Sequence, residues 1–215
     1  YVALFISLAN FILSIYLWLI FDKSSINFQF VENREWLSGF INYKVGVDGV
    51  SILFILLTTF ITPICIISVI STIKHRLKDF LIAILIMETL MIGVFCSLDL
   101  IIFYLFFEGG LIPMFLIIGI WGGERRVYSA FKFFLYTLLG SILMLIAMIV
   151  MWDLSGTTDI TKLLDFNFDA NPNYFMGIYM PVGIQTLLWL AFFASFAVKL
   201  PLFPLHTWLP DAHVQ

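Results

Sequence analysis

Three ionisable residues, Glu88, Glu108 and Lys199, lie inside long apolar runs of this 215-residue sequence. On insertion scales, a charge at the centre of a membrane helix costs about 2.5–3.5 kcal/mol, and such residues usually face protein or water and carry function. Burial favours the neutral form of a carboxyl, whereas a nearby cation favours the carboxylate. A carboxyl under both influences can change protonation when its partner moves, so the pattern points to proton or ion transfer.

Helix-breaking residues accompany Glu108. Two glycines, Gly109 and Gly110, follow it directly and allow another helix to approach closely. Pro113 has no backbone N–H, so we expect it to leave the Gly109 carbonyl free beside the carboxyl. Both groups are suited to holding proton-carrying water.

Lys199 also precedes a predicted helix break. Pro201 and Pro204 follow it, and we expect them to free the carbonyls of Ala197 and Leu200. Non-helical backbone at membrane depth is tolerated only against protein or a wet cavity. A lysine at such a break is typical of an ion or proton site, and Lys199 is the natural partner of Glu108.

Each of these charges also has a purely structural interpretation. Glu108 and Lys199 could form a static buried ion pair that orients helices, although the coinciding helix breaks favour function. Glu88 fits a proton relay and a structurally satisfied carboxyl equally well. Asp48 begins an apolar run, where an acidic residue suits a helix N-terminus, and we expect Lys132 to reach toward the membrane interface.

Metal and cofactor chemistry find little support in the sequence. His206, Asp211 and His213 suggest metal ligands, but Pro210 interrupts any regular helix between the histidines, so we predict no metal site. His206 fits better as a polar cap or proton relay on the broken helix. No glycine-rich nucleotide loop or Cys-x-x-Cys motif occurs, and the first five apolar runs contain no histidine for haem. We therefore expect no cofactor in this chain and no electron transfer by it.

The elements that position these residues are membrane helices. The chain is 62% hydrophobic and 12% charged, with a mean hydropathy of +1.06. Runs of about 20 apolar residues each predict a helical span. The predicted fold is an all-α integral membrane protein: a polytopic bundle of six transmembrane helices, the last one broken, in one incomplete domain over 1–215. The approximate spans are 1–21, 49–73, 80–98, 100–121, 129–152 and 181–205.

The connections predict the orientation and the general class of partner. The short loops 74–79 and 122–132 are basic, whereas the longer links 22–46 and 153–180 contain fewer basic residues. The positive-inside rule places the basic loops, and residue 1 with them, on the cytoplasmic or matrix side. The net charge of −3 offers no basic field for nucleic acid, so the expected surroundings are lipid and other membrane subunits.

Several long motifs resemble a known family. They are 106–115 (FFEGGLIPMF), 119–122 (GIWG), 197–206 (AVKLPLFPLH), 208–213 (WLPDAH), 47–51 (VDGVS) and 132–137 (KFFLYT). They resemble the antiporter-like membrane subunits of NADH–quinone oxidoreductase, in the branch of bacterial subunit M and mitochondrial complex I subunit 4. The resemblance covers nearly the whole chain and implies an antiporter-like fold, with these spans as helices two to seven of fourteen.

The resemblance also implies a function. Glu108 and Lys199 would be the coupled pair of a proton-pumping subunit, while NADH, FMN, iron–sulfur clusters and quinone would be held by other subunits. The implied partners are other membrane-arm subunits, including neighbouring antiporter-like ones. The location would be the bacterial inner membrane, or alternatively the mitochondrial inner membrane.

Three other functions stay open at this point. The chain could belong to a multisubunit Na⁺/H⁺ antiporter or a hydrogenase-linked relative, which sodium dependence would reveal. It could be a structural subunit whose buried charges only hold helices together. A quinone-binding subunit is the least supported, because no substrate-sized polar motif occurs outside the helix breaks.

Overall fold

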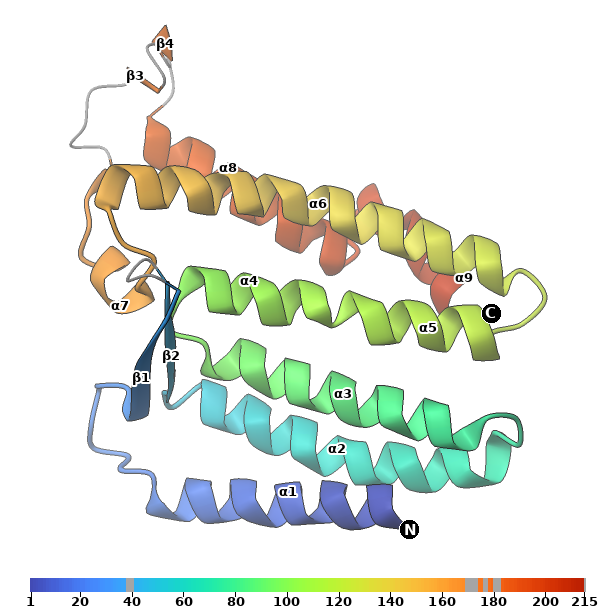
Figure 1. Cartoon of the computed structure of the whole chain (residues 1–215). Coiled ribbons are helices and arrows are strands. Elements are labelled where there is room, and N and C mark those ends of the chain that lie inside the picture. The colour runs from blue at the N-terminus through green and yellow to red at the C-terminus, as the bar shows by residue number, and fades with distance from the viewer. Residues whose placement is uncertain (38–40, 169–173, 176–177, 180–182, 215) are drawn as a thin grey trace.

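Apolar helices that run alongside one another make up most of the protein, in a computed structural model that describes residues 1–37, 41–168, 174–175, 178–179 and 183–214 (Figure 1). Five helical segments of this part are long and apolar enough to cross a membrane. They are α1 Val2–Ile20, α2 Ser51–Thr72, α3 Leu77–Cys96, the segment Leu100–Trp121 and α6 Arg126–Ser155. The sixth predicted span contains a shorter apolar helix, α8 Ile184–Lys199.

Two of the predicted spans are interrupted. The fourth divides at Gly110 into α4 Leu100–Gly109 and α5 Leu111–Trp121, which remain nearly in line. The sixth ends as a regular helix at Lys199 and continues through the 3-10 turn η2 Leu205–Thr207 into α9 Trp208–Val214. The break predicted after Lys199 is therefore confirmed. Several non-helical residues separate α8 from η2 there, whereas α4 and α5 meet at Gly110.

The helices of successive spans are antiparallel neighbours, both where a short loop joins them and where one of the longer links does (Figure 1). α1 packs on α2, α2 on α3, α5 on α6, and α6 on α8 (Figure 1). Gly140 allows the α6–α8 approach, because a Cβ built on it would lie 2.9 Å from the Cβ of Val198. The core beside this contact is apolar and joins α4, α6 and α8 through Leu100, Met144, Met148 and Leu188. The charged residues at the helix breaks are thus carried by closely packed helices.

The link 22–46, for which no regular structure was predicted, contains an antiparallel hairpin. Strand β1 Gln29–Leu37 pairs with β2 Ile41–Val47, with Glu32 opposite Val45 and Arg34 opposite Tyr43. The link 153–180 includes the short helix α7 Ile160–Leu163 and the two-residue strands β3 Tyr174–Phe175 and β4 Ile178–Tyr179. Residues 169–173, 176–177 and 180 of that link lie outside the described residues.

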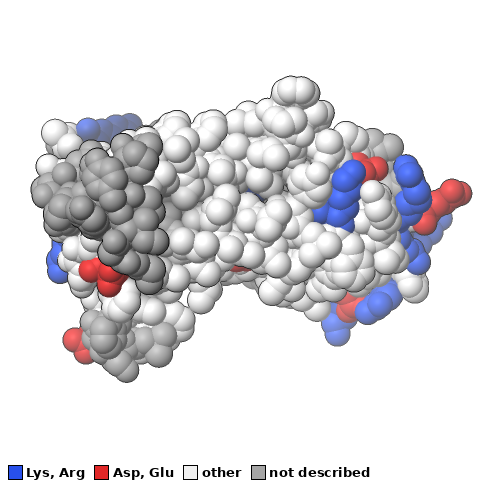
Figure 2. Space-filling view, turned by 90° about the horizontal axis from the view of Figure 1, so that it is seen from above, with Lys and Arg blue, Asp and Glu red and all other residues white. Residues whose placement is uncertain are grey.

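On the face of the bundle that Figure 2 shows, charged side chains lie mainly at the two ends and the surface between them is almost free of charge. The α2–α3 and α5–α6 connections, which carry the basic loops, lie at the same end as residue 1, and the hairpin and α7 lie at the other end (Figure 1). This agrees with the side assignment made from the loop charges.

Candidate functional site

Glu108 lies in the last turn of α4, immediately before the interruption at Gly110. Pro113 lies in the first turn of α5 and has no N–H, so it cannot donate to the Gly109 carbonyl one turn earlier. A Cβ on Gly109 would be 3.1 Å from the side chain of Leu90 in α3, which shows how closely α3 approaches there. The glycine therefore provides close packing next to the carboxyl.

More of the backbone carbonyls at the break after α8 accept hydrogen bonds than the sequence predicted. Ala197 was predicted to have a free carbonyl, but it accepts a hydrogen bond from the Leu202 N–H at 2.9 Å. The buried indole of Trp208 donates to the Val198 carbonyl, also at 2.9 Å. The prediction for Ala197 is therefore wrong, because the chain turns back far enough for Leu202 to replace the donor that Pro201 lacks.

Lys199 ends α8 and reaches α4. Its Nζ donates to the Phe107 carbonyl at 2.7 Å and lies 3.1 Å from the centroid of the Phe107 ring. A cation over an aromatic face is attracted by the ring quadrupole, more strongly where water is excluded. The lysine is therefore held by a backbone oxygen and a ring next to Glu108.

Glu108 and Lys199 meet at the junction of α4, α6 and α8 without a direct ion pair. Both are described, and no N···O contact between them falls within 4.0 Å, although each lies within electrostatic reach of the other. Ser141 of α6 approaches the carboxyl, yet Oε1 of Glu108 is buried and has no hydrogen-bond partner among the described residues. The side chains are thus neighbours, but the carboxyl is left with unused hydrogen-bonding capacity.

Glu88 lies in α3 and is 2% exposed. Neither carboxyl oxygen has a hydrogen-bond partner within the described part of the chain. Asn10 of α1 lies within electrostatic range but makes no hydrogen bond of normal geometry to the carboxyl. Both interpretations of Glu88, as a proton relay and as a structural carboxyl next to Asn10, therefore stay predictions.

His206 lies in the turn η2 beyond the break. Its ring stacks on Phe203 with centroids 5.6 Å apart, and its buried Nδ1 has no partner among the residues that can be described. The side chain of His213 lies outside the described residues. Within the described residues, no group of three His, Cys, Asp or Glu side chains could hold a metal ion.

Two further residues have clear structural roles. Asp48 caps the start of α2, because its Oδ1 accepts the Ser51 N–H at 2.7 Å, as expected for an acidic residue at this position. Lys132 was expected to reach toward the interface, but its Nζ instead contacts Asp211 Oδ2 of α9 at 2.6 Å. The ion pair fixes α9 against α6 on the far side of the break.

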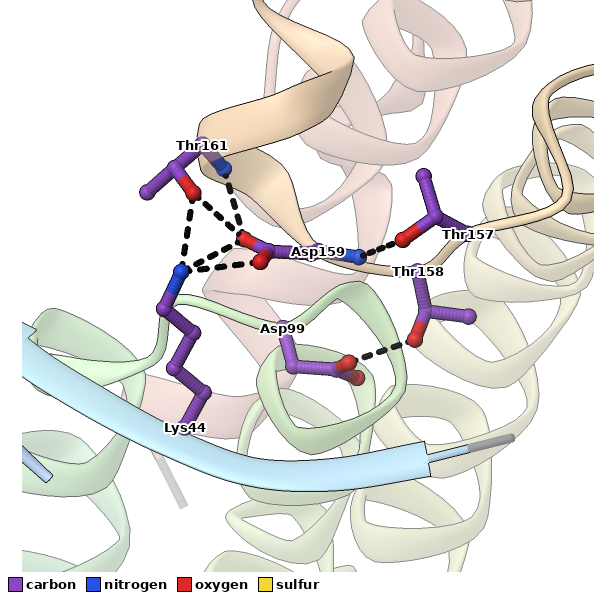
Figure 3. Close-up of polar contacts among 6 residues, drawn as sticks. All are labelled: Lys44, Asp99, Thr157, Thr158, Asp159 and Thr161. Carbon is purple, nitrogen blue, oxygen red and sulfur yellow. Dashed lines mark hydrogen bonds and ion pairs between the residues drawn. The ribbon is translucent and has the colours of Figure 1, made fainter. Parts of the chain in front are cut away.

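A second charged cluster, which sequence reasoning missed, joins three segments at the hairpin end of the bundle (Figure 3). We call it the clasp, and its members are Lys44, Asp99, Thr158, Asp159 and Thr161. Lys44 Nζ contacts both carboxylate oxygens of Asp159, at 2.9 and 2.8 Å, and Thr161 Oγ1 at 2.8 Å. Asp99 accepts from Thr158 and from the first N–H groups of α4.

The pKa values of the two clasp carboxyls are shifted in opposite directions. Burial would raise the pKa of Asp159, but hydrogen bonds from Lys44 and Thr161 hold it below its usual range. Burial raises the pKa of Asp99, although Thr158 and the α4 backbone act against this. Asp99 and Asp159 each precede a helix, and an aspartate at that position is a recognisable helix-start signal in a sequence. Nothing in the sequence linked either residue to Lys44.

Comparison with known proteins agrees with this architecture. The family model described as NADH:quinone oxidoreductase/Mrp antiporter, TM, matches residues 97–215. NADH-quinone oxidoreductase subunit M of Rhodobacter capsulatus is 57% identical over the whole chain, and NADH-ubiquinone oxidoreductase chain 4 of Marchantia polymorpha is 46% identical. The chain spans about 42% of the length of the first relative and 41% of the second.

Solved structures show the same fold. The respiratory complex I from Thermus thermophilus contains a chain with a TM-score of 0.80 and 32% identity, and the alignment covers 98% of this chain and 42% of that one. A chain of the Mrp complex from Dietzia has a TM-score of 0.81 at 18% identity, covering 99% of this chain and 22% of that one, and shows the fold alone.

The chain consists mainly of apolar helices, and two of its predicted spans are interrupted next to charged residues. Together with the likeness to the solved structures, this defines a helical membrane protein with the antiporter-like fold. More narrowly, the chain belongs to the NADH:quinone oxidoreductase/Mrp antiporter transmembrane family.

Proposed function

We propose that this protein is a proton-translocating membrane subunit of an NADH–quinone oxidoreductase, in which Glu108 and Lys199 couple electron transfer elsewhere to proton movement. The observation that carries the proposal is the contact of Lys199 Nζ with Phe107, next to a carboxyl whose Oε1 has no partner among the described residues. The likeness to subunit M of Rhodobacter capsulatus supports the choice of complex. The described span would form part of one antiporter-like domain in the bacterial inner membrane, or in that of mitochondria.

The mechanism is electrostatic. A cation that approaches a buried carboxyl stabilises its ionised form, and a cation that retreats favours proton uptake. Lys199 sits at a helix break, where a small change in backbone direction moves the ammonium relative to Glu108. Redox chemistry on other subunits of the complex would bias that position, and water reaching each face would load and release the proton.

His206 and Glu88 are secondary candidates for the proton path. His206 follows the break and has a buried Nδ1 with no partner among the described residues, so it could exchange a proton between Lys199 and the basic end. Glu88 lies on α3, separate from the junction of α4, α6 and α8, and would act on a different branch. NADH, flavin, iron–sulfur clusters and quinone would be bound by partner subunits, including neighbouring antiporter-like ones.

The decisive test is Glu108→Gln in the assembled complex. The amide keeps the shape of the carboxyl but cannot exchange the proton, so we expect proton pumping to fall at least about tenfold, equivalent to about 1.4 kcal/mol. Vesicle acidification driven by NADH oxidation measures this, and the amount of assembled complex checks integrity. Glu124→Gln, on the exposed loop at the basic end, is the matched control. Normal pumping by assembled Glu108→Gln enzyme would refute the proposal.

Two rival functions give different outcomes. If the charges only hold helices together, the double variant Glu108→Gln with Lys199→Met would retain transport, because no unpaired charge remains buried. If the protein is a sodium/proton antiporter subunit, transport by the unmodified protein would depend on sodium. The Dietzia Mrp likeness, at 18% identity, supports only the shared fold.

A further inference from the structure

The backbone hydrogen bonds at the end of α8 are displaced by one residue. In a regular helix, the N–H of residue 201 would donate to the carbonyl of Ala197, and the N–H of Leu202 would donate to that of Val198. Pro201 has no N–H, and the Leu202 N–H donates to Ala197 instead, at 2.9 Å. The donor that Pro201 lacks is thus replaced at Ala197, and the Val198 carbonyl is the group that loses its helical partner.

Trp208, ten residues after Val198, supplies the replacement. Its indole Nε1–H donates to the Val198 carbonyl at 2.9 Å, and the two residues are only 5% and 8% exposed. A buried carbonyl without a donor costs free energy, and an indole has one donor and no acceptor. The whole hydrogen-bonding capacity of the Trp208 side chain is therefore used on the residue directly before Lys199.

The Trp208 ring is itself held against α6. It packs on Phe133 with ring centroids 5.3 Å apart, in a buried apolar cluster that α5 and α6 share. The ion pair between Lys132 and Asp211, with 2.6 Å between Nζ and Oδ2, ties α9 to the same helix. The position of the indole is therefore fixed relative to α6.

Val198 also contacts α6 through its side chain. A Cβ built on Gly140 would lie 2.9 Å from the Val198 Cβ, so the two helices approach closely at this residue. Phe133 and Gly140 are seven residues apart in α6, which places them on one face of the helix, two turns from each other. This face of α6 holds the Val198 side chain directly and the Val198 carbonyl through Trp208.

We propose that Trp208 is a positioning residue for Lys199. The indole N–H fixes the peptide group that joins Val198 to Lys199, because the six atoms of a peptide group form one plane and move together. A long lysine side chain needs such a fixed origin to keep its Nζ at 2.7 Å from the Phe107 carbonyl, next to Glu108. The positioning role rests on the proposed function, which assigns the coupling to Lys199, whereas the hydrogen bond of Trp208 does not depend on it.

Trp208→Phe tests the role of the N–H in the assembled complex. Phenylalanine keeps an aromatic ring against Phe133 but has no donor, so the Val198 carbonyl loses its partner. We expect proton pumping per assembled complex to fall at least about threefold, because small displacements of a reacting group lower rates steeply. Vesicle acidification driven by NADH oxidation measures the pumping, and the amount of assembled complex normalises it.

Two control variants separate the hydrogen bond from the packing. Phe133→Leu removes the ring on which Trp208 packs and keeps the N–H, so it should lower the midpoint for heat-induced loss of the subunit but largely preserve pumping per assembled complex. Trp189→Phe makes the same substitution at a position of α8 that is 60% exposed, and it should change neither quantity. Pumping that falls as far in Phe133→Leu as in Trp208→Phe would reduce Trp208 to a packing residue.

Returning the donor that the proline removes gives the sharpest check. Pro201→Ala provides an N–H that can donate to Ala197, which leaves the Leu202 N–H free for Val198. The indole donor is then redundant, so Trp208→Phe should lower the heat midpoint much less in this background than with Pro201 present. A double-mutant cycle measures the difference. Equal effects in both backgrounds would overturn the claim that the indole replaces the Leu202 donor.

The positioning role and the proposed function fail in different ways. Normal pumping by Glu108→Gln would refute the proton-pumping role, and the heat-stability cycle would still report on the Trp208 hydrogen bond. Lost pumping in Glu108→Gln combined with normal pumping in Trp208→Phe would keep the proposed function and overturn only the positioning of Lys199 by Trp208.

Discussion

Two lysine–carboxylate sites join segments that are far apart in the sequence, and they are built in opposite ways. In the clasp, Lys44 makes direct contacts of 2.8–2.9 Å with Asp159 and Thr161. At the α4–α6–α8 junction, Lys199 binds a backbone carbonyl and an aromatic ring, while Oε1 of Glu108 has no partner among the described residues. Lys44 forms a direct ion pair with its carboxylate, whereas Lys199 lies near Glu108 without a direct contact.

The difference shows what separates a structural charge pair from a transporting one. A carboxylate held by several donors has one favourable arrangement, so its ionisation hardly depends on small movements. A carboxyl with spare hydrogen-bonding capacity beside a cation is not tied to one arrangement, so the position of the cation can shift its protonation. The clasp is thus suited to fixing the start of α4, and the junction is suited to responding.

Lys199→Met should have the largest effect and would test this contrast directly. The replacement keeps an unbranched apolar chain over the Phe107 ring but removes the cation that stabilises ionised Glu108. We expect proton pumping by the assembled complex to fall at least about tenfold, since about 1.4 kcal/mol of lost electrostatic bias has that effect. NADH-driven vesicle acidification measures it. Lys44→Met is the matched control, and pumping lost equally in both would erase the distinction between the sites.

The sequence predicted the helices and the junction because these depend on local signals. Apolar run length set the spans, and Pro201 set the end of α8 at Lys199. The charges of Glu108 and Lys199 stood out against apolar surroundings, so their importance could be inferred without a structure.

The clasp and the hairpin could not be predicted in the same way. Lys44 and Asp159 are 115 residues apart and lie in polar links, where a charge is ordinary and carries no signal. The satisfied carbonyl of Ala197 was also missed, because a proline shows which donor is lost but not which N–H replaces it. Long-range pairing and the compensation of a break are properties of the folded chain.

Gly140→Ala should have a smaller effect that reaches the junction through packing. The new methyl group would lie 2.9 Å from the Cβ of Val198, the residue before Lys199, so α8 must shift away from α6. Overpacking of this kind costs about 1–3 kcal/mol. We expect a lower midpoint for heat-induced loss of the subunit from membranes, together with a partial loss of pumping. Gly49→Ala, at a position with open space, is the control.

Unchanged stability and pumping in Gly140→Ala would mean that the α6–α8 contact does not fix the position of Lys199. A loss of stability with full pumping per assembled complex would show that the junction tolerates displacement of α8. Either result would weaken the link between close packing and charge coupling.

Lys44→Met should affect stability alone. It leaves Asp159, of which only 13% of the side chain is exposed, without its cation, and the loss of such a charged hydrogen-bond partner costs about 1–2 kcal/mol after allowance for solvent. The midpoint for heat-induced loss of the subunit should fall, while pumping per assembled complex stays normal. Asp153→Asn, at an exposed position in the last turn of α6, should change neither quantity.

The smallest effect concerns the pH range over which Lys44 stabilises the fold. Hydrogen bonds from Lys44 and Thr161 lower the pKa of Asp159 below its usual value of 3.8 despite burial, so the contribution is present above that value and disappears as the pH falls through the folded-state pKa. The heat-stability difference between the unmodified protein and Lys44→Met should therefore be the same at pH 7 and pH 5, and shrink only below about pH 4.

The raised pKa of Asp99 acts in the opposite direction, because its ionised form is the disfavoured one and acid relieves it. That contribution is common to both proteins as long as Lys44 acts mainly on Asp159, so it cancels in the difference. A stability difference that already shrinks between pH 7 and pH 5 would show that Lys44 acts through Asp99. The clasp would then contain a carboxyl that titrates between pH 5 and pH 7. The clasp and the Glu108–Lys199 junction would both respond to proton binding and would differ only in how strongly they do so.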